Sequence, residues 1–168
     1  MDRAELQALQ APLKDRYREE PGAALITLRA DGTLDEEQIA CSVDTGRALV
    51  EAGLHPATGG TGALACSGDM LLEALVACAG VTLRSVATSM ELDVAGSVHA
   101  DGDLDFRGTL GVDREAAVGF TAIRLRFELR SDASEEQLAK LLERTERYCV
   151  VGQTLAGGVP LEFAYGTS

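Results

Sequence analysis

Apolar residues recur at the spacing of an α-helix in three parts of the chain. The first part, residues 1–22, is charged and weakly periodic, which predicts an N-terminal helix or arm. The second part, residues 69–92, is apolar on most sides, so we expect one long helix that is buried on most sides, with Ser67 or Asp69 capping its first N–H groups. The third part begins at a Ser-Glu-Glu-Gln capping box, residues 134–137, and carries an apolar stripe.

Between these segments the apolar period changes to two residues, which predicts strands with one face toward a core. Two Asp-Gly pairs, Asp31-Gly32 and Asp101-Gly102, are flanked by such strands and are predicted to turn a hairpin each. Residues 123–130 alternate apolar and charged side chains without a break, and residues 161–165 offer a last short strand. Strands and helices are segregated along the chain, which favours an α+β fold with antiparallel sheet over a doubly wound fold.

Composition narrows the class of protein. A chain of 168 residues with 46% apolar content can bury one core, so we expect a single domain over residues 1–168. No run approaches the roughly 20 uninterrupted apolar residues of a membrane span, and the N-terminus lacks the order of a secretory signal, so we expect a cytoplasmic protein. Lys and Arg number 15 against 27 Asp and Glu, a net charge of −12, which argues against nucleic acid and anionic membranes as partners.

Four cysteines are the candidates for chemistry: Cys41, Cys66, Cys78 and Cys149. A structural disulfide framework is not expected in a reducing compartment, which leaves packed thiols, metal ligands or reactive thiols. We expect no metal, because there is no Cys-x-x-Cys and only two histidines. Cys41 lies in an alternating strand and is expected to pack there. Cys149 lies on the apolar stripe of the third helix if that helix is unbroken, and periodicity alone favours packed thiols at both Cys78 and Cys149.

Other catalytic signatures are missing from the sequence. Gly-x-Ser-x-Gly does not occur, and the glycine run at residues 59–62 lacks the Lys-Ser/Thr of a phosphate-binding loop, so it is expected to be a loop and no cofactor is expected. A reactive cysteine needs activation, because an ordinary thiol is only a few per cent ionised at neutral pH. Cys78 lies in the middle of its predicted helix, so the helix dipole contributes little there. The activating charge is therefore expected from an arginine.

Two segments carry a family resemblance. The stretch SGDMLLEALVACAGVTL at residues 67–83, which follows a Gly-rich loop, resembles the central helix of the OsmC/Ohr family. The stretch ERYCVVGQTL at residues 146–155 resembles the second cysteine segment of that family, where Lys-Tyr-Cys-Pro-Val-Ser is usual. Between them, GFTAI at residues 119–123 begins an alternating strand that also resembles the family pattern. The resemblance covers roughly residues 59–165.

The resemblance implies a fold and an activity. It implies an intertwined α+β homodimer with the long cysteine-bearing helix at its centre and an active site at the subunit interface. By position, Cys78 would be the peroxidatic cysteine and Cys149 the resolving cysteine of a thiol-dependent hydroperoxide reductase. A dithiol or lipoylated reductant would then reduce the Cys78–Cys149 disulfide, and no bound cofactor is implied. An apolar helix lining favours organic hydroperoxides.

The chain departs from the family pattern near the thiols. Asp69 stands where a glutamate usually orients the activating arginine. That arginine lies upstream in the family, and Arg47 is favoured here because it enters the loop before the Cys78 helix. Three further upstream arginines remain open, and they are Arg16, Arg18 and Arg29.

The residues after the second cysteine differ as well, since residues 150–152 are Val-Val-Gly where the family usually has Pro-Val-Ser. Cys66 is expected to be a packed small residue, with a role as an alternative disulfide partner left open. A second function also remains open: a non-catalytic dimer of the same fold that binds an apolar or thiol-containing ligand in a pocket between its subunits.

Overall fold

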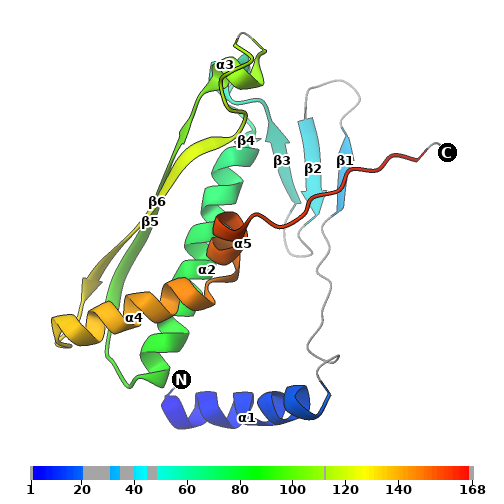
Figure 1. The fold of residues 1–168 in the computed structure, drawn as a ribbon. Helices are drawn as coiled ribbons and strands as arrows, with labels where there is room; N and C mark the ends of the chain where they lie inside the picture. The colour runs from blue at the N-terminus through cyan, green and yellow to red at the C-terminus, as the bar shows by residue number, and fades with distance from the viewer. Residues whose placement is uncertain (1, 21–30, 35–39, 45–48, 112, 167–168) are drawn as a thin grey trace.

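A long helix, α2, lies between a two-stranded ribbon and a small sheet in the computed structural model (Figure 1), which describes residues 2–20, 31–34, 40–44, 49–111 and 113–166. The described elements are, in order, α1 (Arg3–Glu19), β1 (Asp31–Leu34), β2 (Ala40–Asp44), β3 (Leu49–Gly53), the 3-10 turn η2 (Pro56–Thr58), β4 (Ala65–Cys66), α2 (Ser67–Ser89), β5 (Ala95–Leu104), α3 (Phe106–Thr109), β6 (Phe120–Arg130), α4 (Glu135–Tyr148) and α5 (Val150–Gly157). The α+β class with antiparallel sheet is confirmed, whereas the single domain over residues 1–168 stays a prediction.

Helix α2 is the long apolar helix that the sequence predicts, but only one stripe of it is buried. The stripe consists of Leu75, Ala79, Leu83, Val86 and Ala87. It packs against β5, α4 and α5, and opposite it apolar side chains such as Val81, 72% exposed, face away from the chain. Burial on most sides is therefore wrong for one chain, because a two-stranded ribbon and two short helices cannot surround a 23-residue helix.

The start of α2 also differs from the prediction. Its N-cap residue is Cys66, and no side chain caps it. Ser67 and Asp69 lie inside the first turn, where the Asp69 carboxylate faces the positive end of the helix dipole. By length and composition α2 is the one helix among the described residues that could cross a membrane. Core helices of soluble proteins meet the same criteria, and the buried stripe of α2 is packed against protein.

Strands β5 and β6 form a long antiparallel ribbon, and the strand predicted at residues 123–130 is confirmed within β6. The hairpin turn predicted at Asp101-Gly102 is wrong, because both residues lie inside β5 and pair with Arg124 and Ile123. The glycine has a packing reason: a Cβ at Gly102 would lie 2.3 Å from the ring of Phe120. Close approach of an aromatic ring, and not a turn, accounts for glycine at this position.

The other sheet has the order β1-β2-β3-β4, antiparallel except for a short parallel pairing of β3 with β4. The turn predicted at Asp31-Gly32 is also wrong, because these residues belong to β1 and pair with Asp44 and Val43 of β2. Strand pairing with β2 outweighs the local turn preference of an Asp-Gly pair. The strand predicted to precede Asp31-Gly32, at residues 24–29, lies outside the described residues.

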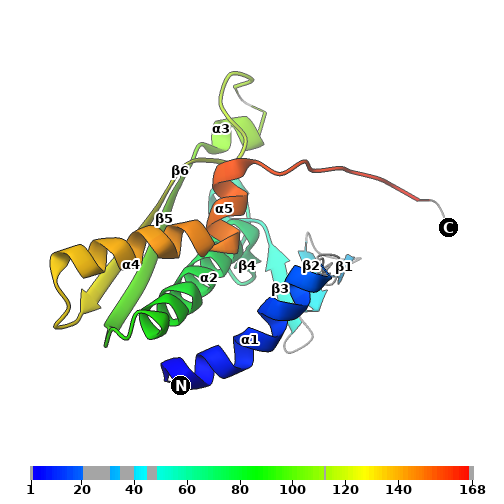
Figure 2. The same cartoon turned by 60° about the horizontal axis from the view of Figure 1, so that its bottom comes forward.

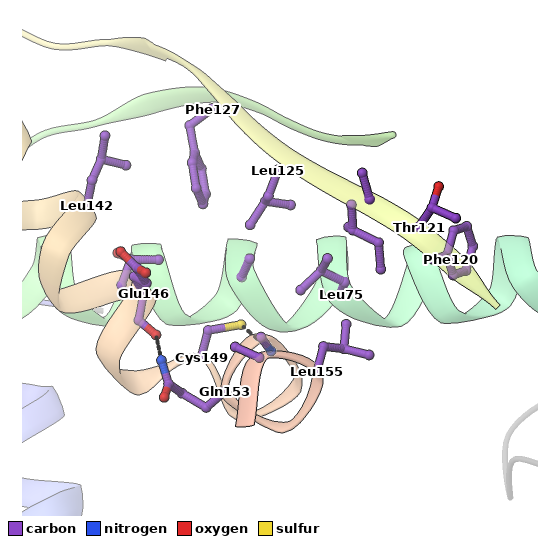
Figure 3. Close-up of a pocket in the computed structure, with 16 residues that line it drawn as sticks. Leu75, Phe120, Thr121, Leu125, Phe127, Leu142, Glu146, Cys149, Gln153 and Leu155 are labelled. Atoms are coloured by element: carbon purple, nitrogen blue, oxygen red, sulfur yellow. Dashed lines mark hydrogen bonds between the residues drawn. The ribbon is translucent and has the colours of Figure 1, made fainter. Parts of the chain in front are cut away.

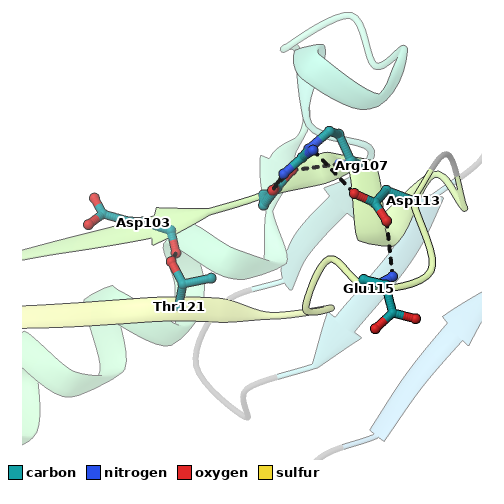
Figure 4. Close-up of polar contacts among 6 residues, drawn as sticks. Asp103, Arg107, Asp113, Glu115 and Thr121 are labelled. Carbon is teal, nitrogen blue, oxygen red and sulfur yellow. Dashed lines mark hydrogen bonds and ion pairs between the residues drawn. The ribbon is translucent and has the colours of Figure 1, made fainter.

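The chain reverses between β5 and β6 through α3, and a group of polar side chains holds this end together (Figure 4). Arg107 pairs with Asp105 at 2.6 Å and with Asp113 at 3.2 Å. The hydrogen bond from Arg107 lowers the pKa of Asp105. On the strands, the Thr121 hydroxyl donates to the carbonyl of Asp103 at 3.1 Å. These contacts are exposed and fix the shape of the turn more than they stabilise the fold.

Two predictions about the ends of the chain have opposite outcomes. The N-terminal helix is confirmed as α1, which contacts α2 (Figure 2). An Arg3–Glu91 ion pair of 2.8 Å joins α1 to the residues just after α2. The strand predicted at residues 161–165 is wrong for one chain, because this segment has no strand pairing and its side chains are exposed. It extends away from the body of the molecule after α5 (Figure 1).

Helix α4 begins at the predicted capping box, in which Ser134 and Gln137 exchange side-chain and backbone hydrogen bonds. The helix ends at Tyr148, and Cys149 has extended backbone angles (φ −71°, ψ 102°) before α5 begins at Val150. The prediction that Cys149 lies on the apolar stripe of one unbroken helix is therefore wrong. Cys149 is nevertheless buried, 3% exposed, because the change of direction at this residue turns its side chain into the core.

Candidate active site

Cys78 and Cys149 lie together where α2 meets the start of α5. Cys149 forms a core cluster with Leu75 and Ala79 of α2, and Cys78 and Val151 pack against that cluster. Cys78 thus packs beside Cys149, and each thiol shifts the pKa of the other. Two cysteines separated by about 70 residues in sequence are thus brought together by the packing of α5 on α2.

The Cys149 side chain caps α5. Its Sγ accepts a hydrogen bond from the backbone N–H of Gly152 at 3.4 Å, so the sulfur takes the place of the oxygen that usually caps a helix. A Cβ at Gly152 would lie 3.3 Å from this sulfur and 3.8 Å from Leu75. Glycine at position 152 therefore lets the first turn of α5 approach both the sulfur and α2.

The environment of Cys78 favours its ionised form. Burial raises the pKa of the Cys78 thiol, but hydrogen bonds from the backbone N–H of Val151, the Cys149 thiol and the backbone N–H of Val150 together lower it below the ordinary value. The Thr82 hydroxyl also lowers this pKa, although it donates to the Cys78 carbonyl oxygen at 2.8 Å. Because one hydroxyl proton serves one acceptor at a time, we assign Thr82 mainly to the carbonyl.

The environment of Cys149 has the opposite effect. Burial raises its pKa, and the hydrogen bond to Cys78 and the charge on Cys78 raise it further, against the lowering effect of the N–H groups of Gly152 and Val151. Cys78 therefore ionises before Cys149, and the proton that remains is held on Cys149. Cys78 is therefore the better candidate nucleophile of the two, and Cys149 is the thiol that keeps its proton more firmly.

A cavity of about 630 Å³ opens beside Cys149 (Figure 3). Its apolar wall includes Leu125 and Phe127 of β6, which point toward α2, together with Leu75 of α2. Further lining comes from α4 and α5, where the Gln153 amide donates to the Glu146 carbonyl oxygen at 2.9 Å. The volume and the apolar lining suit a small organic molecule.

The other predicted site residues are not brought to Cys78 within the described part of the chain. Asp69 precedes Cys78 by nine residues, about two and a half turns, and therefore lies on the opposite face of α2. It lines a separate hollow with Leu72, Glu73, Val76, Ala77 and Ala100. Arg47 and Arg29 lie outside the described residues, and Arg16 and Arg18 belong to α1. The roles predicted for Asp69 and the arginines stay predictions.

The two remaining cysteines are placed apart from the pair. Cys66 is half-buried at the start of α2, three turns before Cys78, and Cys41 lies in β2 opposite Leu34 and Ala52. Among the described residues no cluster of three or more His, Cys, Asp or Glu could hold a metal ion.

Sequence reasoning missed the backbone N–H groups of residues 150–152. It placed Cys149 inside a continuous helical stripe, which hides the N-terminus of a second helix next to Cys78. Neither proline nor glycine marks the break, since residues 149–151 are Cys-Val-Val. The sequence does offer one signal for the N–H groups, although not for the helix break. Residue 150 is valine where the family usually has proline, so this chain keeps an N–H group at that position.

Comparison with known proteins identifies the family of this chain. The OsmC-like protein family model matches residues 60–164, which include both cysteines. The structure is similar to an OsmC-like protein from Mycoplasma pneumoniae, with a TM-score of 0.65, 18% identity, and coverage of 79% of this chain and 89% of the other. No curated protein matches the sequence.

A second similar structure is an organic hydroperoxide resistance protein from Elizabethkingia anophelis, with a TM-score of 0.56, 16% identity, and coverage of 80% of this chain and 91% of the other. An OsmC-like protein of unknown function from Vibrio cholerae has a TM-score of 0.63 at 15% identity, over 77% of this chain and 94% of the other. At these identities the structures establish the fold, whereas the family model matches more than half of the sequence. The chain belongs to the OsmC-like family.

Proposed function

We propose that the protein is a thiol-dependent peroxidase that reduces organic hydroperoxides, with Cys78 as the attacking and Cys149 as the resolving cysteine. The observation that carries the proposal is the contact between a thiol with lowered pKa and a buried, protonated thiol. Similar structures named as organic hydroperoxide resistance proteins support the same chemistry.

The chemistry has three steps. The Cys78 thiolate attacks one oxygen of the O–O bond: an S–O bond forms, the O–O bond breaks, and the alkoxide leaves with the bonding electrons and takes a proton to become an alcohol. The Cys149 sulfur then attacks the Cys78 sulfenic acid, so that an S–S bond forms and the hydroxyl leaves as water with the Cys149 proton. A dithiol, such as a lipoyl group in a reducing cytoplasm, restores both thiols by exchange and becomes a disulfide itself.

The cavity that Cys149 lines supports an organic substrate. Its wall of leucine and phenylalanine side chains removes an alkyl group from water, which stabilises binding by about 0.8 kcal/mol for each buried CH₂. Hydrogen peroxide has no such group, so alkyl hydroperoxides are the expected substrates.

Treatment of the reduced protein with one equivalent of cumene hydroperoxide tests the proposal. We expect the intact mass to fall by two hydrogens within minutes, and peptide mapping to find Cys78 linked to Cys149. The matched control is hydrogen peroxide at the same concentration, which is expected to react more slowly. If the mass is unchanged after minutes, the enzyme proposal fails, and binding of an apolar or thiol-containing ligand becomes the better account of the cavity.

We also propose that the protein is an intertwined homodimer. Two apolar surfaces of the single chain support a second copy as their partner. One is the face of α2 that carries Val81, and the other is the extended tail, where Phe163 and Tyr165 are 91% and 95% exposed. The tail carries large apolar residues at the alternate positions 161, 163 and 165, which suits a strand added to the sheet of another chain. The strand predicted at residues 161–165 would form in this way.

Substitution of both tail aromatics (Phe163→Ser with Tyr165→Ser) is expected to weaken the dimer. Each aromatic contributes roughly 1.5–3 kcal/mol when buried, so the dissociation constant should rise at least a hundredfold. Light scattering during gel filtration should then give a monomer mass of 17.7 kDa at low micromolar concentration. Glu162→Gln, on the other face of the tail, is the control and should remain dimeric. A wild-type monomer, or a dimeric double variant, would contradict the proposal.

A further inference from the structure

The cavity that Cys149 lines carries charge at one end. Most of its lining is apolar, and Figure 3 shows that it runs along α2 from Glu146 of α4 at one end to Phe120 and Thr121 of β6 at the other. Within the described part of the chain, Glu146 is the one acidic residue of the lining, and the lining contains no Lys, Arg or His. An apolar cavity of about 630 Å³ is thus bordered by a single carboxylate.

The negative charge of Glu146 is not neutralised by an ion pair. None of the ion pairs among the described residues involves Glu146. The neighbouring Arg147 places its guanidinium over the ring of Tyr148, 5.6 Å from the ring centroid. Glu146 is tied to Gln153 through its backbone, because its carbonyl oxygen accepts the hydrogen bond from the Gln153 amide. The exposed Glu146 side chain therefore keeps its charge at the rim of the cavity.

This charge affects which molecules the cavity can hold. The apolar wall stabilises any alkyl chain that it removes from water. An anionic ligand in the cavity would in addition be repelled by the Glu146 carboxylate, and no cation in the described lining offsets that repulsion. An uncharged ligand meets no such repulsion. The cavity therefore discriminates between ligands that share an alkyl chain and differ in the charge of the head group.

We infer that Glu146 makes this cavity selective for uncharged organic hydroperoxides over hydroperoxides that carry a carboxylate, such as those of free fatty acids. The inference rests on the proposed function for the reaction, whereas the selectivity itself is a property of binding. Glu146 is then a specificity-determining residue and takes no part in the chemistry at Cys78 and Cys149.

Two variants that each remove one negative charge test this role. Glu146→Gln keeps the shape of the side chain, and it preserves the hydrogen bond to Gln153 because that bond uses the backbone carbonyl. Glu136→Gln is the matched control, since Glu136 is exposed on the same helix and does not line the cavity. Ten residues of helix place it about 15 Å from Glu146. That separation exceeds the screening length of about 8 Å at physiological ionic strength.

Binding is measured without peroxide, with octan-1-ol and octanoate as probes of equal carbon number. Titration of the reduced ¹⁵N-labelled protein, followed at the amides of Gly152 and Gln153 in the cavity lining, gives both dissociation constants. We expect octanoate to bind more weakly than octan-1-ol. Glu146→Gln should lower the ratio of the two dissociation constants about three- to fivefold, through octanoate alone, and Glu136→Gln should keep the wild-type ratio. At about 0.5 M sodium chloride the wild-type ratio should approach that of Glu146→Gln, because salt screens the charge.

An unchanged ratio in Glu146→Gln, or an equal change in Glu136→Gln, would overturn the inference. Amides of Gly152 and Gln153 that respond to neither probe would overturn it as well. If the ratio changes as expected while the wild type consumes no cumene hydroperoxide, the proposed peroxidase function is refuted and the selectivity of the cavity stands. In an active enzyme, kcat/KM for a fatty-acid hydroperoxide relative to that for its methyl ester should rise by the same factor in Glu146→Gln.

Discussion

Replacing Cys78 by serine (Cys78→Ser) is expected to lower the rate of hydroperoxide consumption by about a thousandfold or more, because a serine hydroxyl does not ionise at neutral pH and the attacking nucleophile is lost. The side chains differ by one atom, and Cys78 is only half-buried, so the fold should be unaffected. A ferrous-oxidation assay for residual cumene hydroperoxide, with a thiol reductant present, measures the loss.

The control for this variant is Cys66→Ser. Cys66 is half-buried at the start of α2, and serine is a better N-cap than cysteine, so activity should be retained and stability should be equal or slightly higher. A Cys78→Ser protein that consumes peroxide like the wild type would refute the assignment of the attacking thiol. Loss of activity in Cys66→Ser would instead make Cys66 part of the catalytic cycle.

Cys149→Ser is expected to stop the cycle after one turnover. Without a resolving thiol the Cys78 sulfenic acid persists after one equivalent of hydroperoxide, and excess hydroperoxide oxidises it to the sulfinic acid with a second equivalent, so consumption should stop at about two equivalents per chain. Trapping with dimedone, which adds to sulfenic acids, followed by mass spectrometry of the Cys78 peptide, measures the intermediate.

The structure makes Cys149→Ser a clean variant. Serine at position 149 offers an oxygen that can accept the Gly152 N–H as the α5 cap, and Cys149→Ala, which cannot, should lose about 1 kcal/mol of stability in addition. Equal thermal midpoints for Cys149→Ser and the wild type would confirm that the effect is chemical. Continued turnover in Cys149→Ser would show that Cys149 does not resolve the sulfenic acid.

Secondary structure in this fold was predictable where a single residue pattern runs through the whole segment. The alternation in β6, the capping box of α4 and the apolar run of α2 each depend on local physics and appear as expected. The turns predicted at the two Asp-Gly pairs are wrong because contacts distant in the sequence outweigh the local preference. Their turn preference is weaker than strand pairing, and at Gly102 the deciding contact is Phe120, 18 residues later in the chain.

The site was predictable at its two sulfur atoms and not at the groups around them. The segments that flank Cys78 and Cys149 carry enough family pattern to pair them from sequence. The break between α4 and α5 has no sequence signal, because Val150 and Val151 continue a helical pattern as readily as they begin a new helix. Backbone donors carry no side-chain signature, so sequence reasoning turned to an arginine instead.

In the proposed cycle Cys149 is oxidised to form the disulfide with Cys78, and in the structure the same sulfur is the acceptor that caps α5. The hydrogen bond from Gly152 N–H to Cys149 Sγ stabilises the dithiol form. The free energy by which it stabilises that form more than the disulfide opposes oxidation by the same amount. A disulfide whose dithiol form is favoured in this way is a stronger oxidant and is more easily reduced by an external dithiol. The capping of one short helix therefore helps to set the reduction potential of the pair.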